Sequence, residues 1–151
     1  LEFGLRVGVA LPHRLVYKRE GPESRQAAVY QPRSDSLVIN LDDELWSDPV
    51  DLMRDFAMQR LFPSAMSRFP ILHELGHRAH YRALNDPGLW VSYRMTRLGR
   101  QERRIIQREV GLNATNDPLE FVADVFAALL EGRSFGESVM VLDRQYRGPT
   151  P

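Results

Sequence analysis

The sequence predicts an α+β domain in which a small, mostly antiparallel sheet precedes three or four helices. Three observations favour this fold class. Short β-prone runs, separated by glycine and proline, occupy residues 1–41. Apolar residues at helical spacing recur from residue 49 to residue 130. The length of 151 residues and the 43% share of hydrophobic residues are typical of a single globular domain with its own core.

The N-terminal region, residues 1–41, provides the predicted sheet. Its β-prone runs are residues 5–9, 14–17, 27–30 and 36–41. The last of these is the clearest strand, and the turn signals Gly21-Pro22 and Pro32-Arg33-Ser34-Asp35 separate the others.

Helical patterns fill most of the remaining chain, at residues 49–62, 71–84, 90–110 and 118–130. Residues 64–131 are predicted to carry the functional helices, and residues 132–151 to form a C-terminal tail. Pro70 can occupy the first turn of the second helix, and Asn85-Asp86-Pro87-Gly88 is a strong stop signal. Gly76 costs about 1 kcal/mol inside that helix. The cost is tolerable if another segment or a substrate must approach the backbone there.

The stretch His73-Glu74-Leu75-Gly76-His77 matches H-E-x-x-H, the zinc-binding signature of metallopeptidases. Residues four apart lie on one face of a helix, so His73 and His77 can coordinate the same Zn²⁺. Glu74 can reach a metal-bound water without being a ligand and would act as general base. The alternative is that both histidines are ordinary core or surface residues. Three of the four histidines fall within residues 73–80, however, and packing or solvation alone does not explain that cluster.

Catalytic zinc usually has three protein ligands and an open position for water, so a third ligand is expected. A metzincin would continue the motif with glycine at position 80 and histidine at position 83. The chain has His80 and Ala83 there, which excludes that subclass. His80 lies one turn beyond His77 and is interpreted as a residue that supports a ligand or lines the cleft.

Glu120 is the predicted third ligand. It lies in the first turn of a helix, residues 118–130, that is apolar around much of its circumference and should be buried. Glu120 and Asp124 are one turn apart, and burying two carboxylates without partners would be costly. Glu120 would bind the metal, and Asp124 would accept a hydrogen bond from the free N–H of His73 or His77. Alternatively, Glu120 is a solvated first-turn residue, or Asp117 or Asp124 binds the metal.

The order His73-Glu74-x-x-His77 and then Glu120-x-x-x-Asp124 resembles the gluzincin pattern of two histidines and a downstream glutamate. The run of residues 119–127 is similar to the glutamate helix of lethal-factor-like toxin domains and of ImmA/IrrE-type peptidases. The resemblance covers residues 36–131 and implies a zincin-like fold, in which an edge strand borders the zinc cleft. An extended peptide could dock there by strand addition.

The resemblance implies a zinc-dependent endopeptidase that acts on a protein or peptide substrate. Its setting would be that of an exported effector or toxin in a host cell, or of a bacterial cytoplasmic peptidase that cuts a repressor. Two departures stand in the sequence. The spacing from His77 to Glu120 is longer than in ImmA/IrrE-type proteins, and residues 111–115 lack the tyrosine that lethal-factor-like domains place before the glutamate.

The group that would stabilise the oxyanion of peptide hydrolysis is left open by these departures. The candidate donors are Tyr93, Tyr146, His80 and Arg144. The alternative for each tyrosine is packing in the core or at its rim.

The overall charge gives no preference for a polyanion, since 20 Lys and Arg balance 20 Asp and Glu, and nucleic acid is not expected as a partner. No window approaches 18 apolar residues, so no membrane span is predicted, and no signal-peptide pattern is visible. The absence of cysteine excludes disulfides and a cysteine–zinc site. A monomer is the expected state.

An arginine stripe is the remaining feature, formed by Arg94, Arg97, Arg100, Arg103, Arg104 and Arg108. It is interpreted as a solvated helix face, with a phosphate-binding face or a rim that selects acidic substrate segments as alternatives. The competing function is a non-catalytic binding module with a structural zinc, which uses the Arg94–Arg108 stripe. Glu74 argues against it, because a structural site is usually closed by four protein ligands and needs no base.

Overall fold

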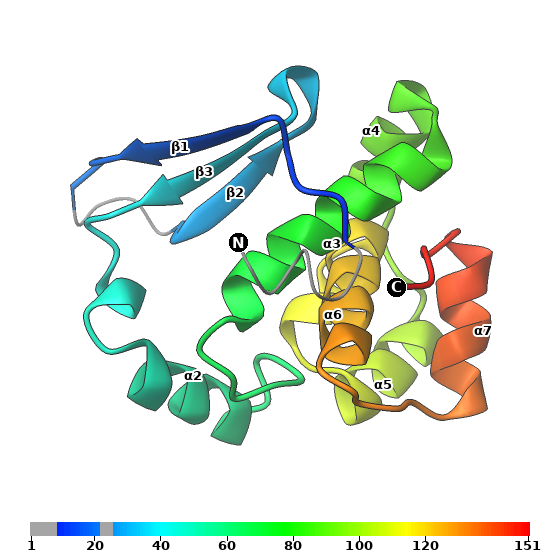
Figure 1. Ribbon diagram of the computed structural model, residues 1–151. Coiled ribbons are helices and arrows are strands. Elements are labelled where there is room, and N and C mark those ends of the chain that lie inside the picture. The colour runs from blue at the N-terminus through cyan, green and yellow to red at the C-terminus, as the bar shows by residue number, and fades with distance from the viewer. Residues whose placement is uncertain (1–8, 22–25) are drawn as a thin grey trace.

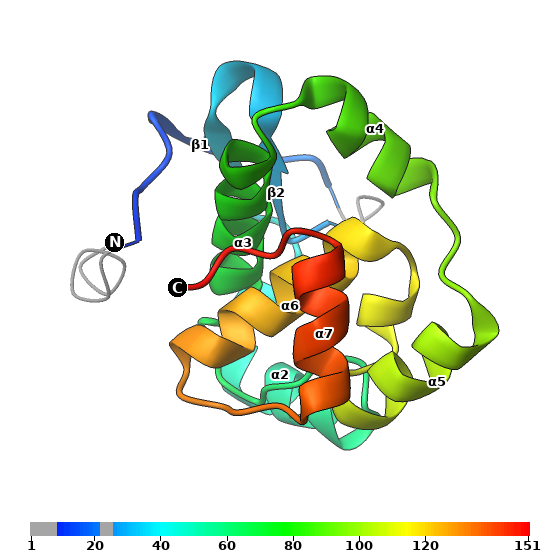
Figure 2. The ribbon, with the colours of Figure 1, turned by 90° about the vertical axis from the view of Figure 1, so that its right-hand side faces the viewer.

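The computed structural model describes residues 9–21 and 26–151, and the fold in this part of the chain is α+β. A small sheet lies over one side of the helix α3 (Phe69–Leu84), and the helix α6 (Pro118–Leu130) crosses its other side (Figure 1). The other helices surround this central pair (Figure 2). Because α3 and α6 carry the predicted metal ligands, the centre of the fold is also the centre of the candidate site.

The sheet consists of β1 (Arg14–Lys18), β2 (Ala28–Gln31) and β3 (Ser36–Asn40), in the order β1-β3-β2. These strands confirm three of the predicted β runs. The first run falls mostly outside the described residues. The sheet is mixed, since β3 pairs antiparallel with β2 and parallel with β1, so only the first pairing fits the expectation of a mostly antiparallel sheet. A short 3-10 turn, Pro32–Ser34, reverses the chain between β2 and β3, and β3 lies between β1 and β2 in the sheet although it follows both in the sequence.

Six α-helices occupy the described part of the chain, more than the three or four predicted. The helices other than α3 and α6 are α2 (Pro49–Met58), α4 (Pro87–Met95), α5 (Arg100–Glu109) and α7 (Glu137–Gln145). Residues 90–110 are not one helix, because the chain is extended at Thr96 and again at Gly99, whose N–H donates to the Glu102 carboxylate at 2.6 Å. The segment expected as a C-terminal tail contains α7.

The contact between α3 and α6 explains the glycine inside the metal-binding motif. A Cβ atom on Gly76 would lie 2.9 Å from both the Cα and the carbonyl oxygen of Ala123 in α6. Real side chains do not come this close to a backbone, so only glycine allows the two helices to approach to this distance. The helix-propensity cost of Gly76 is therefore offset by the approach that brings the two ligand-bearing helices together.

A buried ion pair fastens the sheet to α3. Arg78, of which only 3% is exposed, donates to the two carboxylate oxygens of Asp35 from Nε at 2.7 Å and Nη2 at 2.9 Å. Its Nη1 donates to the carbonyl of Ala10 at 2.6 Å, and the Tyr30 hydroxyl donates to Asp35 at 3.0 Å. We call these four residues the Arg78 cluster. It ties the turn before β3, the strand β2 and the N-terminal segment to one residue of α3.

The remaining packing is apolar. One core cluster lies between α5, α6 and α7 around Ile106, Phe121 and Val139, and a second lies between α2, α3 and α6 around Met53 and Phe69. No helix in the ranges 9–21 and 26–151 has the length and apolar character needed to cross a membrane.

Candidate metal centre

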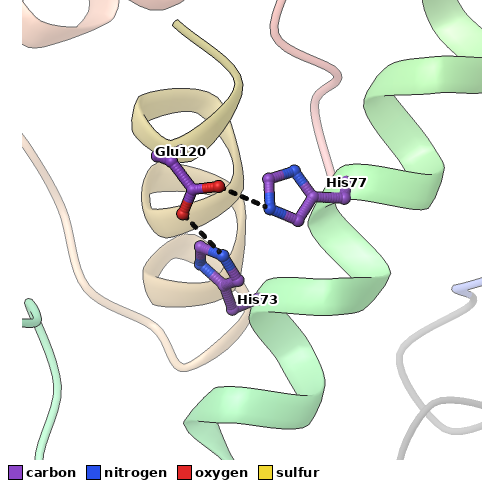
Figure 3. Close-up of side chains that lie close together, drawn as sticks. All are labelled: His73, His77 and Glu120. Carbon is purple, nitrogen blue, oxygen red and sulfur yellow. Dashed lines mark ion pairs between the residues drawn. The ribbon is translucent and has the colours of Figure 1, made fainter. Parts of the chain in front are cut away.

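The side chains of His73, His77 and Glu120 converge between α3 and α6 (Figure 3). The Nε2 atom of His73 lies 3.3 Å from one carboxylate oxygen of Glu120, and the Nε2 atom of His77 lies 3.3 Å from the other. The two histidines stand one turn apart on α3. The carboxylate of Asp117 caps α6 by accepting from the N–H groups of Leu119 and Glu120, and this fixes Glu120 in the first turn.

The spacing of these atoms fits a metal ion. One ligand atom from each of the three residues lies within 4.8 Å of the others. Two ligand atoms at about 2.0–2.1 Å from a tetrahedral zinc are about 3.3 Å apart, which is the separation of each imidazole nitrogen from its Glu120 oxygen. Within the described residues the group contains three candidate ligands, so a fourth position is left for water or substrate.

Two further side chains hold the predicted ligands in place. The Nδ1–H of His73 donates to the fully buried carboxylate of Asp124 at 2.6 Å. The amide nitrogen of Asn113 donates to Glu120 at 3.1 Å and to the second oxygen of Asp124 at 3.3 Å. Asn113 therefore bridges the two carboxylates of α6, while Asp124 orients the ring of His73 so that Nε2 faces Glu120. His77 has no such support, since its buried Nδ1 has no partner among the described residues.

The electrostatics of the cluster favour charged partners. Burial lowers the pKa of His73, but Asp124 and Glu120 outweigh burial and raise this pKa well above its usual 6.5. Burial raises the pKa of Glu120, but His73 and His77 outweigh it and hold this pKa far below its usual 4.5. Glu120 is thus ionised, as a metal ligand must be, whereas His73 carries a proton that a metal ion would have to displace.

Glu74 lies beside the cluster without belonging to it. Its Oε2 accepts a hydrogen bond from the backbone N–H of Tyr30 in β2 at 2.6 Å. No residue of the described chain donates to its other oxygen. Only 9% of Glu74 is exposed, so a fixed strand amide orients its side chain at the wall of the cleft.

The metal centre faces a cleft of about 900 Å³. Residues 26–30 and 42–45 line this cleft, together with Trp90 and Arg94 of α4. Among the described strands, β2 lies at the edge of the sheet and pairs with β3 alone. Ala27 accepts from Asn40 of β3, and antiparallel residues alternate in direction, so Ala28 and Tyr30 turn their backbone groups toward the cleft. This edge is suited to pairing with an extended chain.

The structure does not bring the predicted oxyanion donors to the cleft. The Tyr146 hydroxyl donates to Glu102 at 2.8 Å, Tyr93 packs between Tyr146 and His80, and Arg144 pairs with Glu137. His80 is fully buried, its Nε2–H donates to the carbonyl of Tyr146 at 2.8 Å, and burial lowers its pKa to about 4. His80 thus packs behind the site. Tyr93, Tyr146 and His80 belong to the packing between α3, α4, α5 and α7, whereas Arg144 is an exposed residue of α7.

Sequence reasoning missed three features of the site. These are the Asn113 bridge, the Tyr30 N–H that holds Glu74, and the donor-bearing side chains Trp90 and Asn116 that line the cleft. No local pattern in the sequence marks them, because each depends on how distant segments meet.

No family model, curated protein or solved structure matches this chain. The residues of the site are therefore the basis for the functional conclusion.

Proposed function

We propose that this chain is a zinc-dependent endopeptidase of the gluzincin type, with a zincin-like fold. The observation that carries the proposal is the placement of Glu120 opposite both motif histidines, at 3.3 Å from each, with Glu74 beside them and free of the cluster. The ligand set of two imidazoles and one carboxylate suits zinc. His73, His77 and Glu120 would hold the ion.

The chain's own residues would divide the remaining work. Bound zinc supplies a water whose pKa is lowered to about 7 and a positive charge for the scissile carbonyl. Glu74 would accept the proton of that water on the oxygen that no residue occupies and pass it to the leaving amine nitrogen. Asp124 and Asn113 would keep His73 and Glu120 oriented throughout.

The edge strand β2 would hold the substrate. Ala28 presents backbone groups to the cleft, and pairing with them would place an extended peptide alongside Glu74 and the metal ligands. Such pairing uses the backbone N–H and C=O groups of the substrate, so it tolerates many substrate side chains. The polypeptide class of substrate follows from this edge.

Metal content and turnover test the proposal together. After zinc loading and dialysis, the unaltered chain should hold one zinc per chain, and Glu74→Gln should hold the same amount. Glu120→Gln should lose the metal, whereas Glu44→Gln, which removes an acid at the end of the same cleft, should keep it. A peptide library analysed by mass spectrometry should be cut by the zinc-loaded protein and left intact by Glu74→Gln, with a rate loss of at least about 100-fold.

The proposal fails if the loaded chain holds no zinc, or if Glu74→Gln cuts the same bonds at the same rate. A zinc content that survives Glu120→Gln would move the third ligand to another residue, such as Asp117 or Asp124.

A further inference from the structure

The exposed side of α5, together with the chain leading into it, carries positive charge that the proposed metal centre does not use. Residues 94–108 contain six arginines and one glutamate, although the whole chain has no net charge. We call these six residues, Arg94, Arg97, Arg100, Arg103, Arg104 and Arg108, the arginine face. All six are exposed, and Arg104 and Arg108 lie opposite the buried Ile106 on α5.

Of the two acids of α5, one pairs with a member of the arginine face and the other does not. Glu102 accepts from the N–H of Gly99 and from the Tyr146 hydroxyl, on the side of the helix that faces α7. Glu109 pairs with Arg108. Within the described part of the chain, the other arginines of the face form no ion pair.

Helix stability does not explain these arginines. Arg100 is the first residue of α5, where a cation opposes the helix dipole. Arg100 and Arg104, and likewise Arg104 and Arg108, are like charges four residues apart, a spacing that destabilises a helix. A helix face selected only for solubility would alternate positive and negative residues. The arrangement therefore indicates a negatively charged partner.

The arginine face is continuous with the cleft of the metal centre. Arg94, its first member, lines the cleft together with Trp90 and Asn116. Figure 2 shows α4, the connection after it and α5 as one arc along the edge of the molecule, next to the start of α6. The ten residues of α5 span about 15 Å, which matches about four or five residues of an extended chain.

We propose that the arginine face is a docking surface for an acidic segment of the polypeptide whose neighbouring residues enter the cleft. This deepens the proposed peptidase function and rests on it for the nature of the substrate. An acidic polypeptide fits better than nucleic acid, because the rest of the chain carries an excess of acids. Those acids repel a long polyanion that extends past the face, whereas a short acidic segment matches its length.

Fluorescence anisotropy with a labelled peptide tests the docking surface in the Glu74→Gln protein, which is not expected to cleave the probe. The probe is a peptide of about twelve residues, half of them Asp and Glu. Comparison probes are the same peptide with Asn and Gln in place of the acids, and a duplex DNA of similar length. The acidic peptide should bind about tenfold more tightly than its neutral counterpart at low salt, and the difference should shrink as salt is added.

Two charge-matched triple variants locate the binding. Arg100→Gln/Arg103→Gln/Arg104→Gln should weaken binding of the acidic peptide about tenfold. The control Arg14→Gln/Arg33→Gln/Arg54→Gln removes three exposed arginines from the sheet side and α2, and should weaken it less than about twofold. Equal losses in both variants would overturn the proposal. So would duplex DNA that binds the unaltered face more tightly than the acidic peptide.

Failure here is distinguishable from failure of the peptidase proposal. The anisotropy measurement needs neither bound metal nor turnover, whereas zinc content and the Glu74→Gln rate depend on the metal centre and not on the arginine face.

Discussion

Two clusters of buried charged residues contact α3, and they differ in how the charges meet. In the Arg78 cluster, the arginine and the Asp35 carboxylate are in direct contact at 2.7 and 2.9 Å, the usual length of a charge-assisted hydrogen bond. In the candidate metal centre, each oxygen of Glu120 lies 3.3 Å from a different imidazole nitrogen, a longer contact than the Arg78–Asp35 pair makes. The Arg78–Asp35 pair is in direct contact, whereas the spacing in the candidate metal centre would admit a metal ion between its members.

We interpret the Arg78 cluster as a contribution to the stability of the fold, and the candidate metal centre as a contribution to function. Direct pairs stabilise the folded chain, and breaking one leaves a buried charge alone. In a metal site, by contrast, the ligand side chains are held close together before the metal ion binds. We therefore expect changes in the Arg78 cluster to appear mainly in the free energy of unfolding, and changes in the metal centre mainly in zinc affinity.

The largest expected loss of stability comes from Arg78→Met, which leaves the Asp35 carboxylate without its bidentate partner. Because 16% of the Asp35 side chain is exposed, the charge left behind is only partly buried. We expect the free energy of unfolding to fall by about 2–4 kcal/mol, measured by urea denaturation of the metal-free protein. The matched control is Arg82→Met, since Arg82 is half exposed and 3.9 Å from Asp35. The control should cost less than about 1 kcal/mol. Similar losses in the two variants would show that the buried pair is not the source.

Asp35→Asn should destabilise the protein by about 1.5–3 kcal/mol at pH 7. Asparagine also tolerates the left-handed backbone of this position, with φ of 43°, so the loss reports the charge. Arg78 holds the pKa of Asp35 well below its usual 3.8. The carboxylate therefore contributes stability above that value, and the contribution is lost as pH falls toward the folded-state pKa. The difference in unfolding free energy between the unaltered chain and Asp35→Asn, measured from pH 7 to pH 3, should become smaller below about pH 4. A difference that grows on acidification contradicts the prediction.

Asn113→Ala should act on the metal centre and not on the fold. Removing the bridge between Glu120 and Asp124 should lower zinc affinity by about 10–100-fold, measured by competition with a chromogenic chelator. Asn116→Ala is the control, because Asn116 lines the same cleft but contacts only Asn113, at 3.4 Å. An equal effect of the two substitutions would deny Asn113 a specific role.

Gly76→Ala should affect both properties, because the added methyl group would push α3 away from α6. The overpacking cost of about 1–3 kcal/mol is partly offset by the better helix propensity of alanine, about 1 kcal/mol. A net loss of about 1–2 kcal/mol in unfolding free energy is expected, together with weaker zinc binding. Gly88→Ala, whose Cβ would meet only the Asp86 side chain at 3.3 Å, should leave zinc binding unchanged.

The smallest expected effect is that of Tyr146→Phe. Loss of the hydrogen bond to Glu102 should cost about 0.5–1.5 kcal/mol of stability and leave peptide turnover unchanged, because the hydroxyl is engaged away from the cleft. A large fall in kcat at unchanged stability would instead give Tyr146 the oxyanion role that the sequence suggested.

The sequence predicts that His73, His77 and Glu120 come together, and the structure places them side by side, because helix geometry controls this grouping. His73 and His77 share a face by the helical period, and Glu120 and Asp124 stand out as acids on an apolar helix. No sequence pattern indicates Asn113 or the Tyr30 N–H, because their roles depend on where a 3-10 turn and an edge strand meet α3 and α6. Long-range pairing likewise decides that β1 runs parallel to β3.

Two errors in the helices had local causes. Gly99 could have signalled the break between α4 and α5, but the helix-forming residues around it outweighed this signal. The second error is the helix α7, where a C-terminal tail was expected. Its apolar residues recur at helical spacing and are buried, and this pattern predicts a helix; they are Val139, Leu142 and Tyr146.

The hydrogen bond from Tyr30 to Glu74 also bears on self-association. An uncovered edge strand can pair with the same strand of another molecule and start aggregation. Here β2 is only four residues long, and Glu74 already occupies one of its cleft-facing N–H groups. Glutamine at position 74 keeps an oxygen for that N–H, whereas alanine would release it. We therefore expect Glu74→Gln to remain dispersed at the high concentrations that substrate trapping requires, and Glu74→Ala to aggregate sooner.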